Sequence, residues 1–160
     1  MTTENKCAVR CAQKSDGEAM LALMPRLAAF EIPESRVAEH LWVHDAALMR
    51  EWIEGKTDNV LMHVAEDENR LIVGVAMVTL RPEMLSHEPS AHLEAIAVSD
   101  GMEGRGVGQM LLEAAESEAR RQGAKTITLH VFASNKRARS FYERSGYDGE
   151  LMRYIKPIED

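Results

Sequence analysis

The chain has 160 residues, of which 45% are hydrophobic and 28% charged, a composition typical of one globular domain. Its formal net charge of −7 argues against a nucleic-acid-binding protein, because neutralising phosphates requires a basic surface. No apolar run approaches the roughly 20 residues of a membrane-spanning helix, and the first residues lack the apolar stretch of a signal peptide. We therefore expect a single domain over 1–160, cytoplasmic, with no nucleic-acid or membrane partner.

The charges are distributed unevenly along the chain. Residues 101–160 contain ten Lys/Arg and nine Asp/Glu, whereas residues 1–100 contain nine Lys/Arg and seventeen Asp/Glu. One interpretation places an anionic ligand on the C-terminal part and a cationic ligand on the N-terminal part. The alternative is that these charges lie on solvated faces without a ligand.

The first half of the chain is predicted to contain helices between strands. Asp16 is a candidate N-cap of the first helix, and Pro33 ends this helix. The spacing of apolar residues indicates the helices and strands of this half. The expected order is a strand at 7–13, a helix from 17 to about 30, a helical stretch at 34–54 in one or two pieces, strands at 60–65 and 71–80 joined by a polar turn, and a loop at 81–90.

The second half alternates strands and helices. The expected order is a strand at 91–99, a glycine-rich loop at 100–108, a helix to 121, a strand at 126–132, a helix at 136–145 and a strand at 150–155. Together with the first half, this order predicts a mixed α/β sheet with a strand–helix–strand unit at its centre.

Four glycines fall within eight residues between a strand and a helix: Gly101, Gly104, Gly106 and Gly108. Without side chains, the backbone can approach a bulky group, and the helix start supplies unpaired N–H groups for an anion. This pattern favours a phosphate-binding loop over a plain turn. The P-loop motif is absent and the glycine spacing differs from the dinucleotide-binding pattern.

Two segments together resemble a known family. Ala95-Ile96-Ala97-Val98 precedes the loop, and a later helical segment carries Asn135, Ala138, Phe141, Tyr142, Gly146 and Tyr147. This pair of motifs resembles the GNAT superfamily of N-acetyltransferases, over nearly the whole chain in element order and most specifically over 93–147. The chain departs from the family at Glu103, where a Gln or Arg is usual, and at Asp100, where a Pro is usual.

The resemblance implies a fold and a reaction. The implied fold is α/β (α+β): a mixed, mostly antiparallel sheet of six to seven strands with a central splayed parallel pair and helices on both faces. The implied reaction moves an acetyl group from acetyl-CoA, the co-substrate, to a primary amine of a small molecule or peptide by direct attack in a ternary complex. No metal is implied, and because dimers are common in the family, a homodimer is a candidate assembly.

The resemblance also implies which residues hold acetyl-CoA. Because Glu103 would bring a carboxylate close to the diphosphate, the contacts are expected from the backbone amides of about 104–109, with Arg105. The implied cofactor-binding residues are Ile96, Ala97, Val98, Glu103, Gly104, Arg105, Gly106, Val107, Gly108, Gln109, Asn135, Ala138, Arg139 and Tyr142.

Two residues are candidate catalytic groups by resemblance. Alternation in the strand would place Glu94 on the same face as Ile96 and Val98. An acid here relays a proton in the family, and a base is needed because an alkyl amine of pKa ~10.4 is protonated at neutral pH. Tyr142 matches the tyrosine that protonates the departing CoA thiolate, or only donates a hydrogen bond to it. The alternatives are a solvent-facing Glu94 and a core tyrosine packed on Phe141.

The acceptor pocket of the family falls at Phe30 and Glu31 here, and Glu31 is a candidate partner for an ammonium group. His40 and His44 have a four-residue spacing but lack the zinc-protease motif, so no metal site is expected.

Two alternative functions stay open: a CoA-binding sensor or interaction module without turnover, and a transferase of a longer acyl group. The presence of both Glu94 and Tyr142 favours the enzyme.

Overall fold

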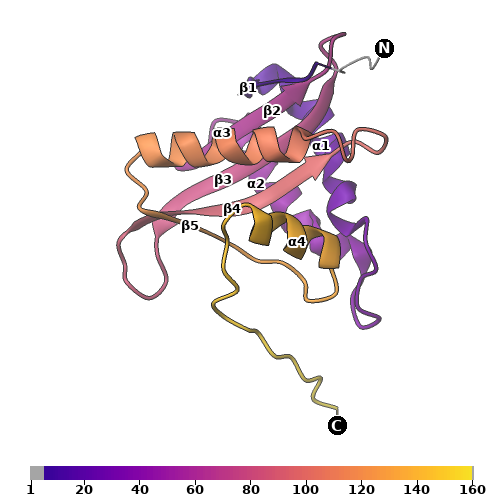
Figure 1. The fold of residues 1–160 in the computed structure, drawn as a ribbon, viewed down its shortest axis with the longest axis vertical. Coiled ribbons are helices and arrows are strands. Elements are labelled where there is room, and N and C mark those ends of the chain that lie inside the picture. Colours follow the sequence, from indigo (N-terminus) through magenta and orange to yellow (C-terminus); the bar gives the residue numbers. More distant parts are fainter. Residues whose placement is uncertain (1–5, 160) are drawn as a thin grey trace.

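A computed structural model describes residues 6–159. Its centre is a five-stranded sheet in which the strands lie side by side in chain order (Figure 1). Neighbouring strands are antiparallel from the first to the fourth, and the fourth and fifth are parallel. The strands are β1 (Ala8–Cys11), β2 (Val60–Glu66), β3 (Ile72–Pro82), β4 (Pro89–Val98) and β5 (Thr126–Leu129).

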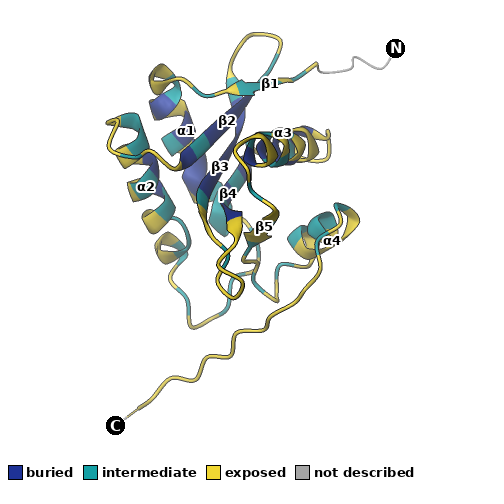
Figure 2. Ribbon diagram, turned by 90° about the vertical axis from the view of Figure 1, so that its left-hand side faces the viewer, coloured by how far each residue is buried: buried dark blue, intermediate teal, exposed yellow. Residues whose placement is uncertain are grey.

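Helices lie on both faces of this sheet, as Figure 2 shows with the sheet seen edge-on. On one face are α1 (Gly17–Leu23) and α2 (Val43–Ile53), and on the other are α3 (Val107–Arg121) and α4 (Lys136–Arg144). Short 3-10 helices complete the first half, at Lys14–Asp16, Met24–Ala28 and Ala38–Leu41.

The core consists of two apolar layers, one on each face of the sheet. Met20 and Met49 from α1 and α2 pack on one face, and Leu111 from α3 packs on the other. Residues 73–79 of β3 are all buried, because this central strand is covered on both faces. The continuous apolar run in β3 reflects burial on both faces of the strand. The periodic apolar residues of α3 reflect burial on one side of the helix.

The parallel pair separates along its length. Pairing of β4 with β5 runs from Ser90 to Leu93, where β5 ends at Leu129, and β4 continues to Val98. The C-terminal part of β4, residues 94–98, therefore has no strand beside it on the β5 side among the described residues. The predicted parallel pair is therefore present, and its pairing stops short of the end of β4. The pair lies at the edge of the sheet, because β5 is the last strand in the order, so its predicted central position is wrong.

A β-bulge interrupts β4 where this separation begins. Met77 pairs with Ala95 and the next residue, Val78, pairs with Leu93, so Glu94 is an extra residue without a partner in β3. A bulge breaks the strict alternation of side chains and reorients them. The prediction that Glu94 shares a face with Ile96 and Val98 is therefore wrong. Both residues pack in the α3 layer, whereas Glu94 accepts a hydrogen bond from Thr79 on the α1/α2 face.

The sheet has five strands, so the prediction of six to seven is wrong. Residues 150–155, expected to form the last strand, are in no strand and lead away from the body as an extended tail (Figure 1). Leu151, Met152, Tyr154 and Ile155 in this tail are 63–85% exposed. The alternation of apolar residues predicted a strand, but strand propensity expresses packing on a neighbouring strand, and this segment has none.

Several helix boundaries also differ from those predicted. The first helix ends at Leu23, and a 3-10 helix with Pro25 in its first turn, Met24–Ala28, replaces the expected continuation to residue 30. Asp16 precedes α1, but its carboxylate makes no capping hydrogen bond to that helix. It accepts hydrogen bonds from Arg10 and from the backbone N–H of Gln13 instead, because a guanidinium binds it with two bonds at once.

Candidate functional site

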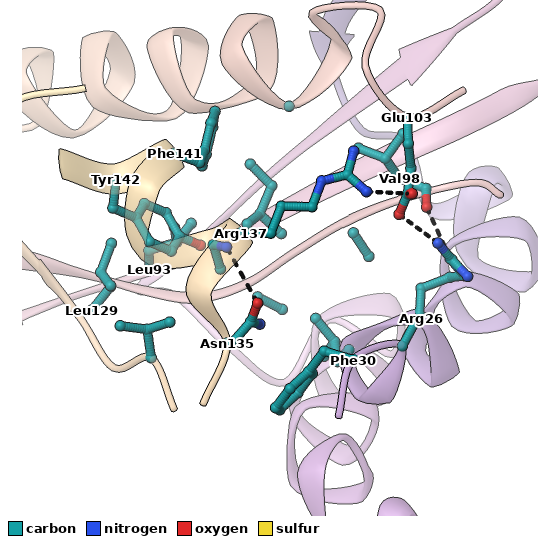
Figure 3. A pocket seen from close by; sticks show the side chains of 18 of the residues that line it. Arg26, Phe30, Leu93, Val98, Glu103, Leu129, Asn135, Arg137, Phe141 and Tyr142 are labelled. Atoms are coloured by element: carbon teal, nitrogen blue, oxygen red, sulfur yellow. Dashed lines mark hydrogen bonds and ion pairs between the residues drawn. The ribbon is translucent and has the colours of Figure 1, made fainter. Parts of the chain in front are cut away.

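A cavity of about 590 Å³ opens beside the unpaired part of β4. Its walls come from elements on both faces of the sheet, as Figure 3 shows. They are residues 93–98 of β4, residues 102–104 and 106–109 of the glycine-rich loop and the start of α3, residues 129–132 at and after the end of β5, Asn135, Arg137, Ala138, Phe141, Tyr142 and Arg144 at α4, Arg26, Leu27, Ala29 and Phe30 after α1, and Leu41 and Asp45. The cavity therefore collects segments that lie far apart in the sequence.

The glycine-rich loop forms one end of this cavity. Gly104 and Gly106 have φ angles of 75° and 80°, a left-handed backbone that glycine adopts without strain. Gly106 is the residue before α3, and a Cβ atom at Gly104 or Gly106 would meet no protein atom within 4 Å. The first N–H groups of α3 thus lie beside open space with the positive end of the helix dipole, which is an arrangement suited to binding an anion.

Glu103 in this loop is held by two arginines. Its Oε1 accepts from Nη2 of Arg26 at 2.5 Å, and its Oε2 accepts from Nη1 of Arg137 at 2.7 Å. Arg26 also donates from Nε to the carbonyl of Val98 at the end of β4. Hydrogen bonding to Arg137 is the main cause that holds the pKa of Glu103 below its usual value, so the carboxylate is charged at neutral pH.

The start of α4 forms a second wall. Asn135 caps the helix, because its Oδ1 accepts from the backbone N–H of Ala138 at 3.2 Å. Ala138, Phe141 and Tyr142 line the cavity from this helix. The small side chain of Ala138, one helical turn before Phe141 and Tyr142, leaves room along this face of α4 for a ligand.

Tyr142 is enclosed by aromatic rings. The ring centroids of Phe141 and Tyr147 lie 5.2 Å and 5.7 Å from its own, and burial raises the pKa of Tyr142 to about 12. At neutral pH its hydroxyl is therefore protonated and able to donate a hydrogen bond. Tyr147 does not line the cavity. Its hydroxyl donates to Glu116 at 2.8 Å.

Two carboxylates face the cavity from the α1/α2 side of the sheet. Glu94, whose side chain is 15% exposed, accepts a hydrogen bond from Thr79 at 2.6 Å and lies 3.7 Å from Nη1 of Arg81. Asp45 of α2 is half-buried, and burial, followed by the charge of Glu94, raises its pKa to about 6. This end of the cavity is therefore acidic, whereas Arg26 and Arg137 make the loop end basic.

Most of the residues predicted to hold acetyl-CoA line this one cavity, as do both predicted catalytic residues, Glu94 and Tyr142. Those predicted for the cofactor that line it are Ile96, Ala97, Val98, Glu103, Gly104, Gly106, Val107, Gly108, Gln109, Asn135, Ala138 and Tyr142. Arg105 and Arg139 are not among the lining residues, and Arg139 donates instead to the carbonyl of Ala133. The roles of all these residues stay predictions.

The predicted acceptor residues are separated by the structure. Phe30 lines the cavity, and its ring lies 5.6 Å from that of Phe132. Glu31 is not a lining residue; its backbone carbonyl accepts a hydrogen bond from Ser134. The sequence analysis missed Arg26 and Asp45, which lie far from both motifs and carry no local signal.

The family follows from comparison with known proteins. Residues 26–147 match the profile of the Acetyltransferase (GNAT) family. The chain belongs to this family. Mycothiol acetyltransferase from Jonesia denitrificans is 29% identical over 135 residues, which are 83% of this chain and 40% of that protein. Across the curated relatives, the matched part spans 26–59% of their own length.

Solved structures with the same fold cover nearly the whole chain. A Pyrococcus furiosus protein assigned as an acetyl transferase superposes with a TM-score of 0.78 at 22% identity, covering 96% of this chain and 100% of that one. AAC(6')-Iy in complex with the bisubstrate analogue CoA-S-monomethyl-acetylneamine superposes with a TM-score of 0.71 at 19% identity, covering 96% and 99%. At these identities the likeness shows the fold.

None of the helices between residues 6 and 159 is long and apolar enough to cross a membrane.

Proposed function

We propose that the protein is an acetyl-CoA-dependent N-acetyltransferase that acts on a primary amine of a small molecule. The observation that carries this proposal is the shared cavity. It joins open backbone at the N-terminus of α3 to Glu94 and Tyr142 in a chain of the acetyltransferase family. Donor and acceptor would meet there without a covalent enzyme intermediate, so that much of the rate enhancement comes from positioning.

The loop end is the proposed place of the donor. The N–H groups at the start of α3 bind the diphosphate, and Asn135 and Ala138 border the path of the pantetheine arm along α4. A solved neighbour of the same fold, AAC(6')-Iy, was crystallised with CoA, which supports a CoA thioester as the donor. The thioester group would then lie beside the end of β4, near Val98.

The carboxylate end is the proposed place of the acceptor. An alkyl ammonium group is attracted there by Asp45 and Glu94, and Leu27, Phe30 and Leu41 offer an apolar wall for its carbon skeleton. Glu94 accepts the amine proton, directly or through water. The ammonium group must lose this proton before its nitrogen can attack. Without a base, this deprotonation costs about 4–5 kcal/mol at neutral pH.

In the transfer step, the neutral amine nitrogen attacks the thioester carbonyl carbon, a carbon–nitrogen bond forms, and the carbon–sulfur bond breaks. The nitrogen loses a second proton, which reaches the departing sulfur through water, so that the products are the amide and the CoA thiol. Tyr142 lies in the cavity wall to donate a hydrogen bond to the departing sulfur. With its pKa near 12 and a thiol near ~8.5, full proton transfer would be uphill by roughly 5 kcal/mol. The hydroxyl therefore acts as a hydrogen-bond donor to the developing thiolate.

A panel of amines tests this proposal. Purified protein is incubated with acetyl-CoA and alkyl amines, diamines, aminoglycosides, amino acids or peptides. Thiol release is then followed and the product is identified by mass. We expect release that depends on a primary amine. CoA binding without turnover of any amine would instead identify a binding module, and amine-dependent turnover only with longer acyl-CoA would identify a different acyltransferase.

A further inference from the structure

The glycine-rich loop carries a carboxylate at the position where the proposed donor brings its diphosphate. Glu103 precedes Gly104, and both of its carboxylate oxygens are occupied, one by Arg26 and the other by Arg137 (Figure 3). All three residues line the cavity. The protein therefore holds an anion of its own between two cations beside the start of α3.

The two arginines come from opposite faces of the sheet. Arg26 belongs to the 3-10 helix after α1, and its Nε is fixed by the carbonyl of Val98 at 3.2 Å. Arg137 belongs to α4, and its side chain reaches across the cavity to the loop (Figure 3). Glu103 thus joins the loop to both walls of the proposed donor site.

These ion pairs are of the kind that a ligand can replace. The side chains of Arg137, Glu103 and Arg26 are 70%, 37% and 25% exposed, and ion pairs that water reaches contribute little to stability. A diphosphate carries more negative charge than one carboxylate and presents several oxygens to a guanidinium. Both arginines can therefore exchange Glu103 for phosphate oxygens at small cost.

We propose that Glu103 is an internal competitor of the donor's diphosphate. It occupies Arg26 and Arg137 in the free protein, and the diphosphate displaces it from both. This inference rests on the proposed use of acetyl-CoA. It adds Arg26 and Arg137 to the donor-binding residues and makes Glu103 the residue that lowers donor affinity.

The variant Glu103→Gln tests this competition. It keeps the size of the side chain and removes its charge, so both arginines become free for phosphate. We expect calorimetric titration to give CoA binding roughly five- to twentyfold tighter than in the wild type, because each exposed pair corresponds to at most about a fivefold change in equilibrium constant. Pantetheine, which lacks phosphates, should bind both proteins equally, and Arg137→Gln should bind CoA more weakly than the wild type.

A matched control is Glu143→Gln, since Glu143 is exposed on α4 and does not line the cavity. It loses the same charge and should leave CoA affinity unchanged. Equal or weaker CoA binding by Glu103→Gln, or an equal gain for pantetheine, would overturn the inference. The proposed function would survive as long as the wild type binds CoA. Absence of CoA binding by the wild type and by Glu103→Gln would instead overturn the proposed function itself.

Discussion

The two ends of the cavity differ in how the chain builds them. Most of the proposed donor end comes from two short segments, 103–109 and 135–142, each with a recognisable pattern, and packing adds Arg26 from the first half of the chain. The proposed acceptor end, formed by Asp45, Glu94 and Phe30, brings together single residues from a helix, a bulged strand and the irregular segment after a 3-10 helix. A site made of local segments can be identified from sequence, whereas a site made by tertiary packing requires the structure.

The ends also differ in charge. Arg26 and Arg137 lie at the donor end, and Asp45 and Glu94 lie at the acceptor end. The uneven charge along the sequence agrees with this only in part, because Arg26 comes from the acidic first hundred residues and Glu103 from the basic remainder. The interpretation that the protein binds two ligands of opposite charge therefore stays a prediction. It is supported by the two arginines and the two carboxylates named above, which line the cavity.

The largest effect is expected at the donor end, from Gly106→Val. Its φ of 80° is unfavourable for a branched residue, and the new side chain would fill the space in which the diphosphate approaches. We expect calorimetry to show that CoA affinity falls at least a hundredfold, because the main contacts of the site would be lost. Gly101→Val is the control, because Gly101 has a φ of 82° but does not line the cavity. An equal loss in both variants would assign the effect to backbone strain.

Between the two ends, Tyr142→Phe removes only a hydroxyl. We expect kcat to fall roughly ten- to a hundredfold, since a hydrogen bond to developing charge is lost, with CoA affinity unchanged. Tyr147→Phe is the matched control, because the Tyr147 hydroxyl bonds to Glu116 outside the cavity. Unchanged kcat in Tyr142→Phe would make Tyr142 a packing residue only.

At the acceptor end, Asp45→Asn removes one of two carboxylates. We expect KM for alkyl amines to rise about tenfold, as for one charge-assisted contact, with KM for acetyl-CoA unchanged. An aromatic amine, neutral at pH 7, should be unaffected. Glu31→Gln is the control, because Glu31 lies outside the cavity. A rise in KM with Glu31→Gln and none with Asp45→Asn would reverse the assignment.

The raised pKa of Asp45 also predicts a pH dependence. Its carboxyl is charged above about pH 6 and neutral below it, so attraction for an ammonium group is lost as the pH falls through that value. We expect kcat/KM for an alkyl amine to decline on the acid side near pH 6, and this limb to be absent in Asp45→Asn. Identical profiles for the two proteins would remove Asp45 from acceptor recognition.

The smallest effect is expected away from both ends, at Asp16. Arg10 binds its carboxylate at 2.8 Å and 3.0 Å, and these hydrogen bonds lower the pKa of Asp16. A lowered pKa stabilises the fold above the ordinary carboxyl pKa, and this contribution disappears as the pH falls through the folded value. The free energy of unfolding of Asp16→Asn at pH 7 should therefore be about 1 kcal/mol lower than that of the wild type. This difference between the two proteins should shrink in acid. CoA affinity should not change.

The two segments 103–109 and 135–142, which the sequence singled out, line one cavity in the structure, and they could be singled out because their signals are local. Glycines at positive φ before a helix, an Asn cap and an aromatic pair on one helix each follow from neighbouring residues. Sequence reasoning failed where position depends on a partner strand or helix. The bulge at Glu94 depends on the register against Met77 and Val78, and the missing strand at 150–155 depends on an edge to pair with. Asp45 and Arg26 had no signal, because tertiary packing alone brings them to the cavity.

The most direct test of the account is a calorimetric titration of CoA into the wild-type protein and into Gly106→Val. The account predicts saturable binding at one site per chain in the wild type and binding at least a hundredfold weaker in the variant. Wild-type protein that shows no saturable binding at millimolar CoA would contradict it.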